Sequence, residues 1–227
     1  MNDTLMQSRL RDISNRSLMP ERHYEYLVHL RDNLNIHPKV IYDIGASVLH
    51  WTNMSKIVWA ESKYIAFEAM QESEFLFQEA KIDYFIGALS DQKKTVDFYK
   101  NVENPAGNSY FKENELYSPN AIHLFNESHR TPMLTYTLDE IIEKKQFPYA
   151  DFIKMDVQGA ELDILKGASN ALQHCNNLIL ELQIVEYNKG APLRDTVIDY
   201  LNTIGFTLVC GPFSDNGPDG DYHFTRT

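Results

Sequence analysis

The chain of 227 residues, of which 43% are hydrophobic, is long enough to bury a core in one large or two small domains, and we expect one domain. Its formal net charge of −11 and the lack of a basic run argue against a nucleic-acid partner. No apolar run approaches the roughly 20 residues needed to span a bilayer, the first residues contain no signal-peptide core, and two cysteines are too few for a disulfide framework. We therefore expect a cytoplasmic protein without a membrane partner, in which Cys175 and Cys210 are small buried side chains.

The N-terminal part contains two predicted segments. Residues 1–19 are polar and are expected to form a loosely held arm. After Pro20, apolar side chains recur at helical spacing and predict an amphipathic helix that packs on the domain that follows; they are Tyr24, Leu27, Val28, Leu30 and Leu34. We divide the chain into this N-terminal extension, residues 1–37, and a main domain, residues 38–227.

The first half of the main domain alternates strands with helices. Apolar runs predict buried strands, and a polar-apolar alternation predicts a more exposed one, at 39–45, 64–69, 83–89 and 95–100. Helix-compatible segments lie between the first three, at 47–60 and 70–81. This alternation indicates a parallel sheet that helices cover on both faces.

The middle of the chain is different. Residues 101–130 are rich in Asn, Pro, Ser and Tyr, with only weak helical character near the centre. A loop of this length inside a compact domain is usually a functional lid or a disordered segment. If it is functional, we expect it to decide which ligand the protein accepts.

The second half returns to alternation. Its predicted elements are strands near 132–137, 151–157 and 178–182, helices at 138–145, 159–172 and 193–205, and a final antiparallel hairpin around GPFSDNGPDGD. Gly205 marks the end of the last helix. With about seven sheet strands, the fold class is α/β, a Rossmann-like, doubly wound, mostly parallel sheet with an N-terminal helical extension.

The first strand ends in VIYDIGASVLHW, at the place where such sheets bind ligands. A dinucleotide site needs more glycines than Gly45, and the carboxylate of Asp43 would repel a pyrophosphate, so an NAD-dependent oxidoreductase is disfavoured. S-adenosylmethionine instead carries a sulfonium and an ammonium, which favour a nearby carboxylate. Glu68, at the end of the second strand, is suitably placed for a ribose diol. A buried strand that ends in an ordinary turn remains an equal alternative on this pattern alone.

The segment FIKMDVQGAELDILKGA, residues 152–168, is more specific. It resembles the FkbM-type methyltransferases, whose pattern reads approximately I-K-hydrophobic-D-V-E-G-A-E-x-x-V-L-K-G, and departs from it at Gln158. The resemblance covers roughly Val40 to Phe206, and its other pieces fall in the family's order: Asp43 to Ala46, Phe67-Glu68, Ala88 to Asp91, Asn108-Ser109, Thr137 to Asp139 and Leu180-Glu181. It implies a Rossmann-like enzyme that uses S-adenosylmethionine, mostly on hydroxyl groups of sugars or natural products.

The resemblance also implies where the cofactor binds. Its contacts would come from three strand ends and the specific motif: Asp43, Gly45, Ala46, Ser47, Glu68, Ala69, Ala88, Leu89 and Asp156. Ala88 and Leu89 would lie near the adenine. The family generally has a glycine where this chain has Leu49, and the larger side chain could crowd the cofactor. A binding protein of the same fold without catalysis is therefore kept as an alternative.

A hydroxyl acceptor must lose a proton, which calls for a general base. Asp156 is the first candidate, and a hydrogen-bonding role in the loop or at the helix N-terminus is its alternative. His123 or His129 in the long loop is the second candidate, although such histidines are usually solvated. Lys154 shares a strand face with Asp156 and is either its partner or an extended surface side chain. No His, Asp or Glu cluster has metal-ligand spacing, so we expect no metal. The sequence leaves the acceptor and the oligomeric state open.

Overall fold

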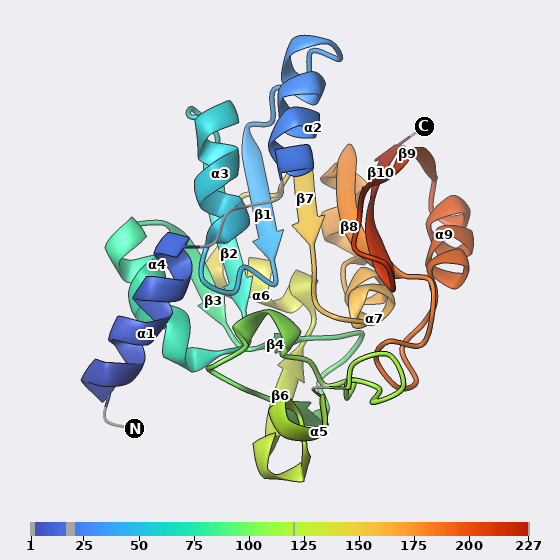
Figure 1. Ribbon diagram of the computed structural model, residues 1–227. Helices are drawn as coiled ribbons and strands as arrows, with labels where there is room; N and C mark the ends of the chain where they lie inside the picture. The colour runs from blue at the N-terminus through green and yellow to red at the C-terminus, as the bar shows by residue number, and fades with distance from the viewer. Residues whose placement is uncertain (1–2, 17–20, 120, 227) are drawn as a thin grey trace.

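The computed structural model describes residues 3–16, 21–119 and 121–226, and a mostly parallel sheet of seven strands forms its centre (Figure 1). In spatial order the strands are β3 (Asp83–Ile86), β2 (Lys63–Glu68), β1 (Val40–Ile44), β7 (Phe152–Met155), β8 (Asn177–Gln183), β10 (Asp219–Arg226) and β9 (Phe206–Asp215). β10 runs antiparallel to both of its neighbours, while β1, β2, β3, β7 and β8 pair in parallel. The predicted fold class and the predicted C-terminal hairpin are confirmed.

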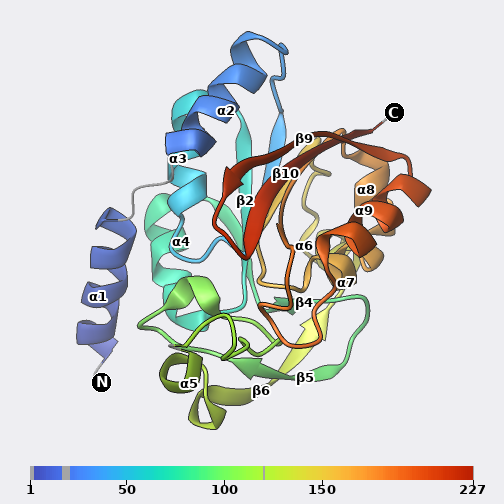
Figure 2. The same cartoon turned by 45° about the vertical axis from the view of Figure 1, so that its right-hand side comes forward.

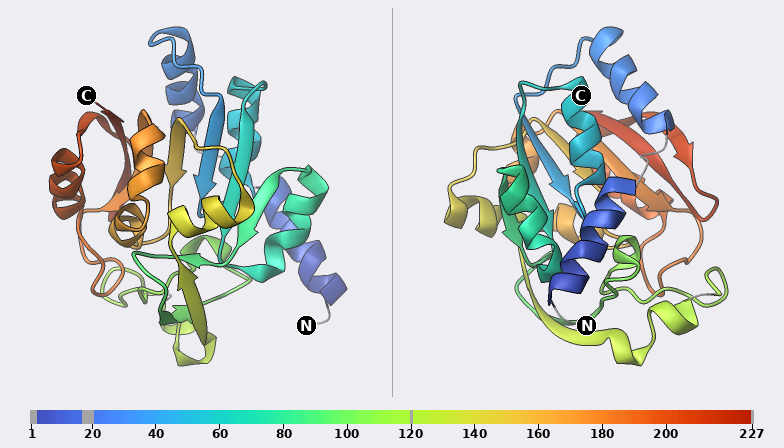
Figure 3. Two further views of the ribbon diagram at one scale, coloured as in Figure 1. Left: turned by 180° about the vertical axis from the view of Figure 1, so that it is seen from behind. Right: turned by 60° about the vertical axis from the view of Figure 1, so that its left-hand side comes forward.

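Helices cover both faces of this sheet, as the view in Figure 1 and the view from behind in Figure 3 show. One face carries α2 (Glu21–Asp32) and α3 (His50–Val58), and the other carries α6 (Leu138–Lys145), α7 (Glu161–Lys166), α8 (Ser169–His174) and α9 (Arg194–Thr203). Successive strand residues supply opposite faces, so Ile41 packs with α2 and α3 while Tyr42 packs with α6 to α9. The continuous apolar strands of the sequence follow from this double burial.

The N-terminal segment differs from the loosely held arm that we expected. Asp3–Arg16 is a helix, α1, that lies beside α4 (Glu74–Ala80) (Figure 2). Leu10 is fully buried, and Met6 and Ile13 pack against the same cluster of apolar side chains. These three residues form an apolar stripe at helical spacing that the overall polarity of the segment conceals.

A second, smaller sheet interrupts the alternation and accounts for two of the predicted strands. It contains β4 (Ala88–Leu89), β6 (Arg130–Tyr136) and β5 (Thr95–Tyr99), in that order, with β5 antiparallel to β6. The long segment between β5 and β6 includes three short helical turns, η2 (Pro105–Gly107), α5 (Ala121–Leu124) and η3 (Glu127–His129). We call the small sheet and the segment between β5 and β6 the insertion. Figure 1 shows it below the carboxyl ends of β1 and β7.

The helix predicted at 159–172 is two helices, α7 and α8. The break lies at Gly167, where a Cβ atom would approach the Ser90 carbonyl oxygen to 2.2 Å. The carboxylate of Asp139 then accepts the backbone N–H groups of Asn170 and Ala171, which begins a new helix. Elsewhere Cys175 is buried as expected, whereas Cys210 is partly exposed. Among the described helices, none combines the length and apolarity needed to cross a membrane.

Candidate functional site

The turn after β1, residues 45–49 and here called the first turn, has an unusual backbone. Gly45 has φ of 79°, and a Cβ atom there would lie 1.8 Å from the carbonyl oxygen of Asp156, so only glycine fits. Ser47 and Leu49 also have positive φ, at 50° and 67°. The backbone N–H of Ser47 donates to Oε2 of Glu68 at 2.6 Å, which ties the first turn to the end of β2.

Glu68 is buried at the end of β2 and lines the same cavity as the first turn. Its Oε1 accepts the N–H of Met70 at 2.8 Å. Burial raises the pKa of Glu68 to about 7, although hydrogen bonds from the N–H groups of Met70 and Ser47 oppose the shift. The carboxylate form accepts hydrogen bonds only, so it suits a ligand with neighbouring hydroxyl groups.

A buried charge network lies between β1 and β7. Lys154 Nζ is 3.1 Å from Oδ2 of Asp156 and 3.9 Å from Oδ1 of Asp43. Burial opposes the charge on Lys154, yet the two carboxylates raise its pKa, so the ammonium is retained. Asp43 also accepts from Oγ1 of Thr52 at 2.6 Å. Asp43 therefore holds the network and α3 together instead of lining the cavity described below.

The contacts of Gln158 show why an amide fits at a position where the family pattern has a glutamate. Its Nε2 donates to Oε2 of Glu181 at 2.7 Å and to Oδ1 of Asp156 at 3.2 Å. Burial disfavours charge on Asp156, but Lys154 and the hydrogen bonds lower its pKa, so Asp156 is ionised. Burial and the neighbouring Asp156 raise the pKa of Glu181 well above its usual range. The amide thus donates to two carboxyl groups, where a glutamate would add a third.

One cavity of about 240 Å³ joins these groups at the carboxyl ends of the strands. Its lining includes eight of the residues predicted from the sequence: Gly45, Ala46, Ser47, Glu68, Ala69, Ala88, Leu89 and Asp156. The insertion closes it from below with side chains such as Phe98, Asn108 and Tyr110. Within the described residues, the lining does not include Asp43, His123 or His129. His123 is exposed, and His129 contacts Asn126 instead.

Leu49 points away from this cavity into the apolar core. It is 2% exposed and belongs to the buried cluster that contains Leu10 of α1 and Phe77 of α4. It is absent from the cavity lining among the described residues. The side chain therefore does not crowd the site, and the consequence of the substitution is a left-handed backbone at a residue with a Cβ atom.

Four buried polar atoms on the cavity walls have no hydrogen-bond partner among the described residues. Three lie in or just after the first turn: Oγ of Ser47, Nε2 of His50 and Nε1 of Trp51. The fourth is Nδ1 of His23 on α2. Buried polar atoms without partners are rare in native proteins, so these atoms indicate a polar ligand. Among the described residues, no three His, Cys, Asp or Glu side chains are placed to bind a metal ion.

His23 is one of the cavity residues that sequence reasoning missed. It is 5% exposed, and its Nε2 lies 2.8 Å from Oδ2 of Asp221 on β10. Phe213 of β9 packs against the edge of its ring. Histidine in the first turn of an amphipathic helix gives no signal by itself, because its partner is almost two hundred positions away.

Comparison with known proteins agrees with this geometry. Residues 42–208 match the family described as Methyltransferase FkbM domain. The chain belongs to this family. The matched range contains the first turn, Glu68, the insertion and the segment around Asp156, and it ends before β10.

Individual relatives are more distant. The chain is 36% identical over 63 residues to the hexuronic acid methyltransferase AglP of Haloferax volcanii, and the match covers 28% of this chain and 26% of that protein. The fold is similar to a Klebsiella pneumoniae structure assigned as an O-methyltransferase, with a TM-score of 0.50 and 10% identity over 98% of this chain and 89% of the other. The precorrin-6y C5,15-methyltransferase of Geobacter metallireducens has a TM-score of 0.49 and 10% identity, over 93% and 90% of the two chains.

Proposed function

We propose that the protein is an S-adenosylmethionine-dependent methyltransferase that methylates a hydroxyl group of a sugar or another small natural product. The observation that carries this proposal is the set of unpartnered polar atoms in and after the first turn, in one cavity with Glu68. Family membership supports the reaction type. The relative that acts on a hexuronic acid supports a sugar acceptor.

The residues present fit the two polar ends of the cofactor. The Ser47 hydroxyl and the indole N–H of Trp51 are donors for the carboxylate of its methionine end. At the other end, Glu68 accepts from the ribose diol. The apolar walls of Ala88 and Leu89 border the space beside Glu68, where the adenine would lie.

When bound, S-adenosylmethionine supplies an activated methyl group, so the protein must position the acceptor, exclude water and take up a proton. Asp156 is a weak base here, because Lys154 and Gln158 stabilise its carboxylate. His23 is better suited: the carboxylate of Asp221 favours the tautomer with its proton on Nε2, which leaves Nδ1 able to accept one. We assign the general base to His23.

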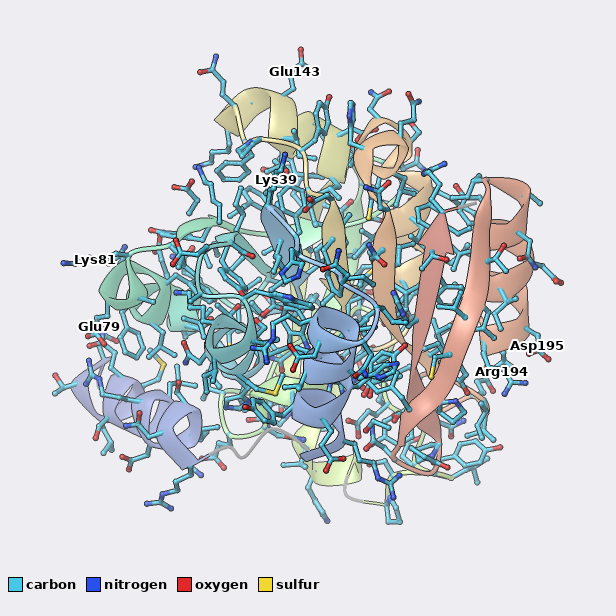
Figure 4. All side chains as sticks on the ribbon, turned by 90° about the horizontal axis from the view of Figure 1, so that it is seen from above. Lys39, Glu79, Lys81, Glu143, Arg194 and Asp195 are labelled. Atoms are coloured by element: carbon cyan, nitrogen blue, oxygen red, sulfur yellow. The ribbon has the colours of Figure 1, made fainter. Side chains whose placement is uncertain are left out.

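Calorimetric titration with S-adenosylmethionine and with S-adenosylhomocysteine tests the cofactor. Glu68→Ala should weaken binding of both by at least about tenfold, the loss expected when hydrogen bonds to a charged group are removed. Glu143→Ala is the matched control, because Glu143 projects outward from α6 (Figure 4). Transfer of a labelled methyl group from S-adenosylmethionine to methyl glycosides tests the reaction. We expect His23→Gln to abolish this transfer. Folded protein that binds neither ligand would favour the non-catalytic alternative.

A further inference from the structure

The cavity has a second half, on the side of β1 away from Glu68. We call it the acceptor half, and it is lined by His23, Asp156, Gln158, Glu181, Asn216 and Asp221. Its carboxyl groups form a row across three neighbouring strands, because Met155 pairs with Leu180 and Glu181 pairs with Asp221. Adjacent strands are about 5 Å apart, so the row spans about 10 Å, enough for one sugar ring.

The acceptor half contains no cation that is free to bind an anion. Among the described residues of the lining, Lys154 is the one lysine or arginine, and it is held by Asp156 and Asp43. A carboxylate of an acceptor would enter beside Asp156, Glu181 and Asp221 without a partner. Placing like charges together in a semi-buried cavity is unfavourable.

The hydrogen-bonding groups of this half are mostly acceptors. The amide groups of Gln158 and Asn216 already donate to Glu181, at 2.7 and 3.3 Å. Nδ1 of His23 is a buried nitrogen without a partner, and with the proton of the ring on Nε2 it accepts. A ligand that brings several N–H or O–H donors therefore complements the acceptor half better than one that brings acceptors.

The pKa of Glu181 reflects the same excess of negative charge. Burial, and then the carboxylates of Asp156, Asp219 and Asp221, raise the pKa of Glu181 well above its usual range, even with the ammonium of Lys154 nearby. This environment therefore favours the protonated form of Glu181. An entering ammonium group would supply the missing positive charge, and the carboxyl group would release that proton.

We propose that the acceptor half recognises a molecule that bears an ammonium group, and that the acceptor is an amino sugar. The proposal rests on the proposed function for the reaction itself. An amino-sugar acceptor would differ from that of the relative AglP, which acts on a hexuronic acid. The charge of the two acceptors would be opposite.

The test is binding of three probes to the full chain saturated with S-adenosylhomocysteine: the methyl glycosides of glucosamine, glucose and glucuronic acid. The glucosaminide should bind about tenfold more tightly than the glucoside, and the glucuronide should bind most weakly. Calorimetry in phosphate and in Tris, which differ in heat of ionisation, should show that only the glucosaminide releases a proton. A glucuronide that binds as tightly as the glucosaminide, or a glucosaminide that does not bind, would overturn the proposal.

Two variants locate the effect. Glu181→Gln should reduce the preference for the glucosaminide over the glucoside to within about threefold. Asp195→Asn is the matched control, because its side chain is 78% exposed at the start of α9 and points outward (Figure 4). An unchanged preference in Glu181→Gln would contradict the assignment, and the order of the three probes on the wild-type chain decides the question if that variant does not fold. If S-adenosylhomocysteine does not bind, the proposed function fails, and the same order measured on the ligand-free chain still tests this proposal.

Discussion

Leu49 combines an unfavourable backbone with a favourable side chain. Its φ of 67° costs about 1 kcal/mol for a residue with a Cβ atom. Burial of its side chain against Leu10 and Phe77 contributes about 2 kcal/mol in return. The first turn can therefore keep its shape without the glycine that the family pattern has at this position.

Leu49→Gly should lower the free energy of unfolding by about 2 kcal/mol, because the loss of packing exceeds the relief of strain. The affinity for S-adenosylhomocysteine should stay within about twofold of the wild type, since the leucine side chain is not part of the cavity wall. Urea unfolding and calorimetry measure the two quantities. A large loss of affinity with normal stability would mean that Leu49 shapes the site directly.

Glu161 shows how a buried carboxyl group makes stability depend on pH. Its Oε1 accepts the N–H groups of Val157 and Gly159, so it supports the turn before α7. Burial raises its pKa to about 7 from a usual value of 4.5. The folded state therefore keeps a proton that the unfolded chain loses between these two values.

Relative to Glu161→Gln, which does not titrate, the wild type should lose stability as pH rises from about 4.5 to about 7 and should then level off. Between pH 5 and pH 7 the difference in unfolding free energy should change by about 2 kcal/mol. Urea denaturation of both proteins across this range measures it, and the other titrating groups cancel in the comparison. A difference that is independent of pH would show that Glu161 is ionised throughout.

At the scale of elements, α1 supports the site from outside. Oγ of Ser14 donates to the carbonyl oxygen of Val48 at 2.7 Å, which holds the outer side of the first turn. Arg11 pairs with Glu79 of α4 at 2.5 Å, and Figure 4 shows Glu79 beside α1. Since both side chains of that pair are about half exposed, the pair adds little, and Leu10 contributes most to docking.

Leu10→Ala should therefore loosen α1, lower the free energy of unfolding by about 2 to 4 kcal/mol and weaken S-adenosylhomocysteine binding several-fold. Leu5→Ala makes the same chemical change on the same helix at a side chain that is 60% exposed, and it should alter neither quantity. Hydrogen exchange of the amides in residues 3–16 shows whether the helix has detached. If α1 detaches and binding is unchanged, α1 does not support the first turn.

At the scale of the molecule, the site collects segments from the whole chain. The cavity is lined by α2, the ends of β1, β2, β7 and β8, the insertion and the C-terminal hairpin. A ligand that fills this cavity would contact segments from α2 near the N-terminus to the C-terminal hairpin. Binding should therefore stabilise the protein as one unit.

S-adenosylhomocysteine at a hundred times its Kd should raise the free energy of unfolding by about 2.7 kcal/mol, through binding to the folded state alone. Thermal unfolding at several ligand concentrations measures this. Limited proteolysis within residues 101–119 should slow in parallel, because this part of the insertion borders the cavity. Protection of the sheet without protection of this part would mean that the insertion does not close on the ligand.

Local sequence patterns were sufficient for the main sheet, and eight of the residues named from them line the cavity. Apolar strands that alternate with amphipathic helices specify a doubly wound sheet, and a glycine after the first strand locates its ligand edge. Residues such as Gly45, Glu68 and Asp156 could be named because each lies at the end of a strand, next to a motif of nearby residues. Periodicity also indicated α2 and α9, whereas α1 was missed because its short apolar stripe is diluted by charge.

The tertiary structure alone decided which distant residues meet. In it, β4, β5 and β6 form a second sheet, and His23 lies next to Asp221. His123 and His129 do not line the cavity formed by the described residues. The sequence by itself determined the fold class, the family and the edge of the sheet at which the cavity lies, because these depend on neighbours within a few residues. The proposed general base and the charge of the proposed acceptor half depend on side chains from elements far apart in the chain, and only the packing of those elements sets their distances and burial.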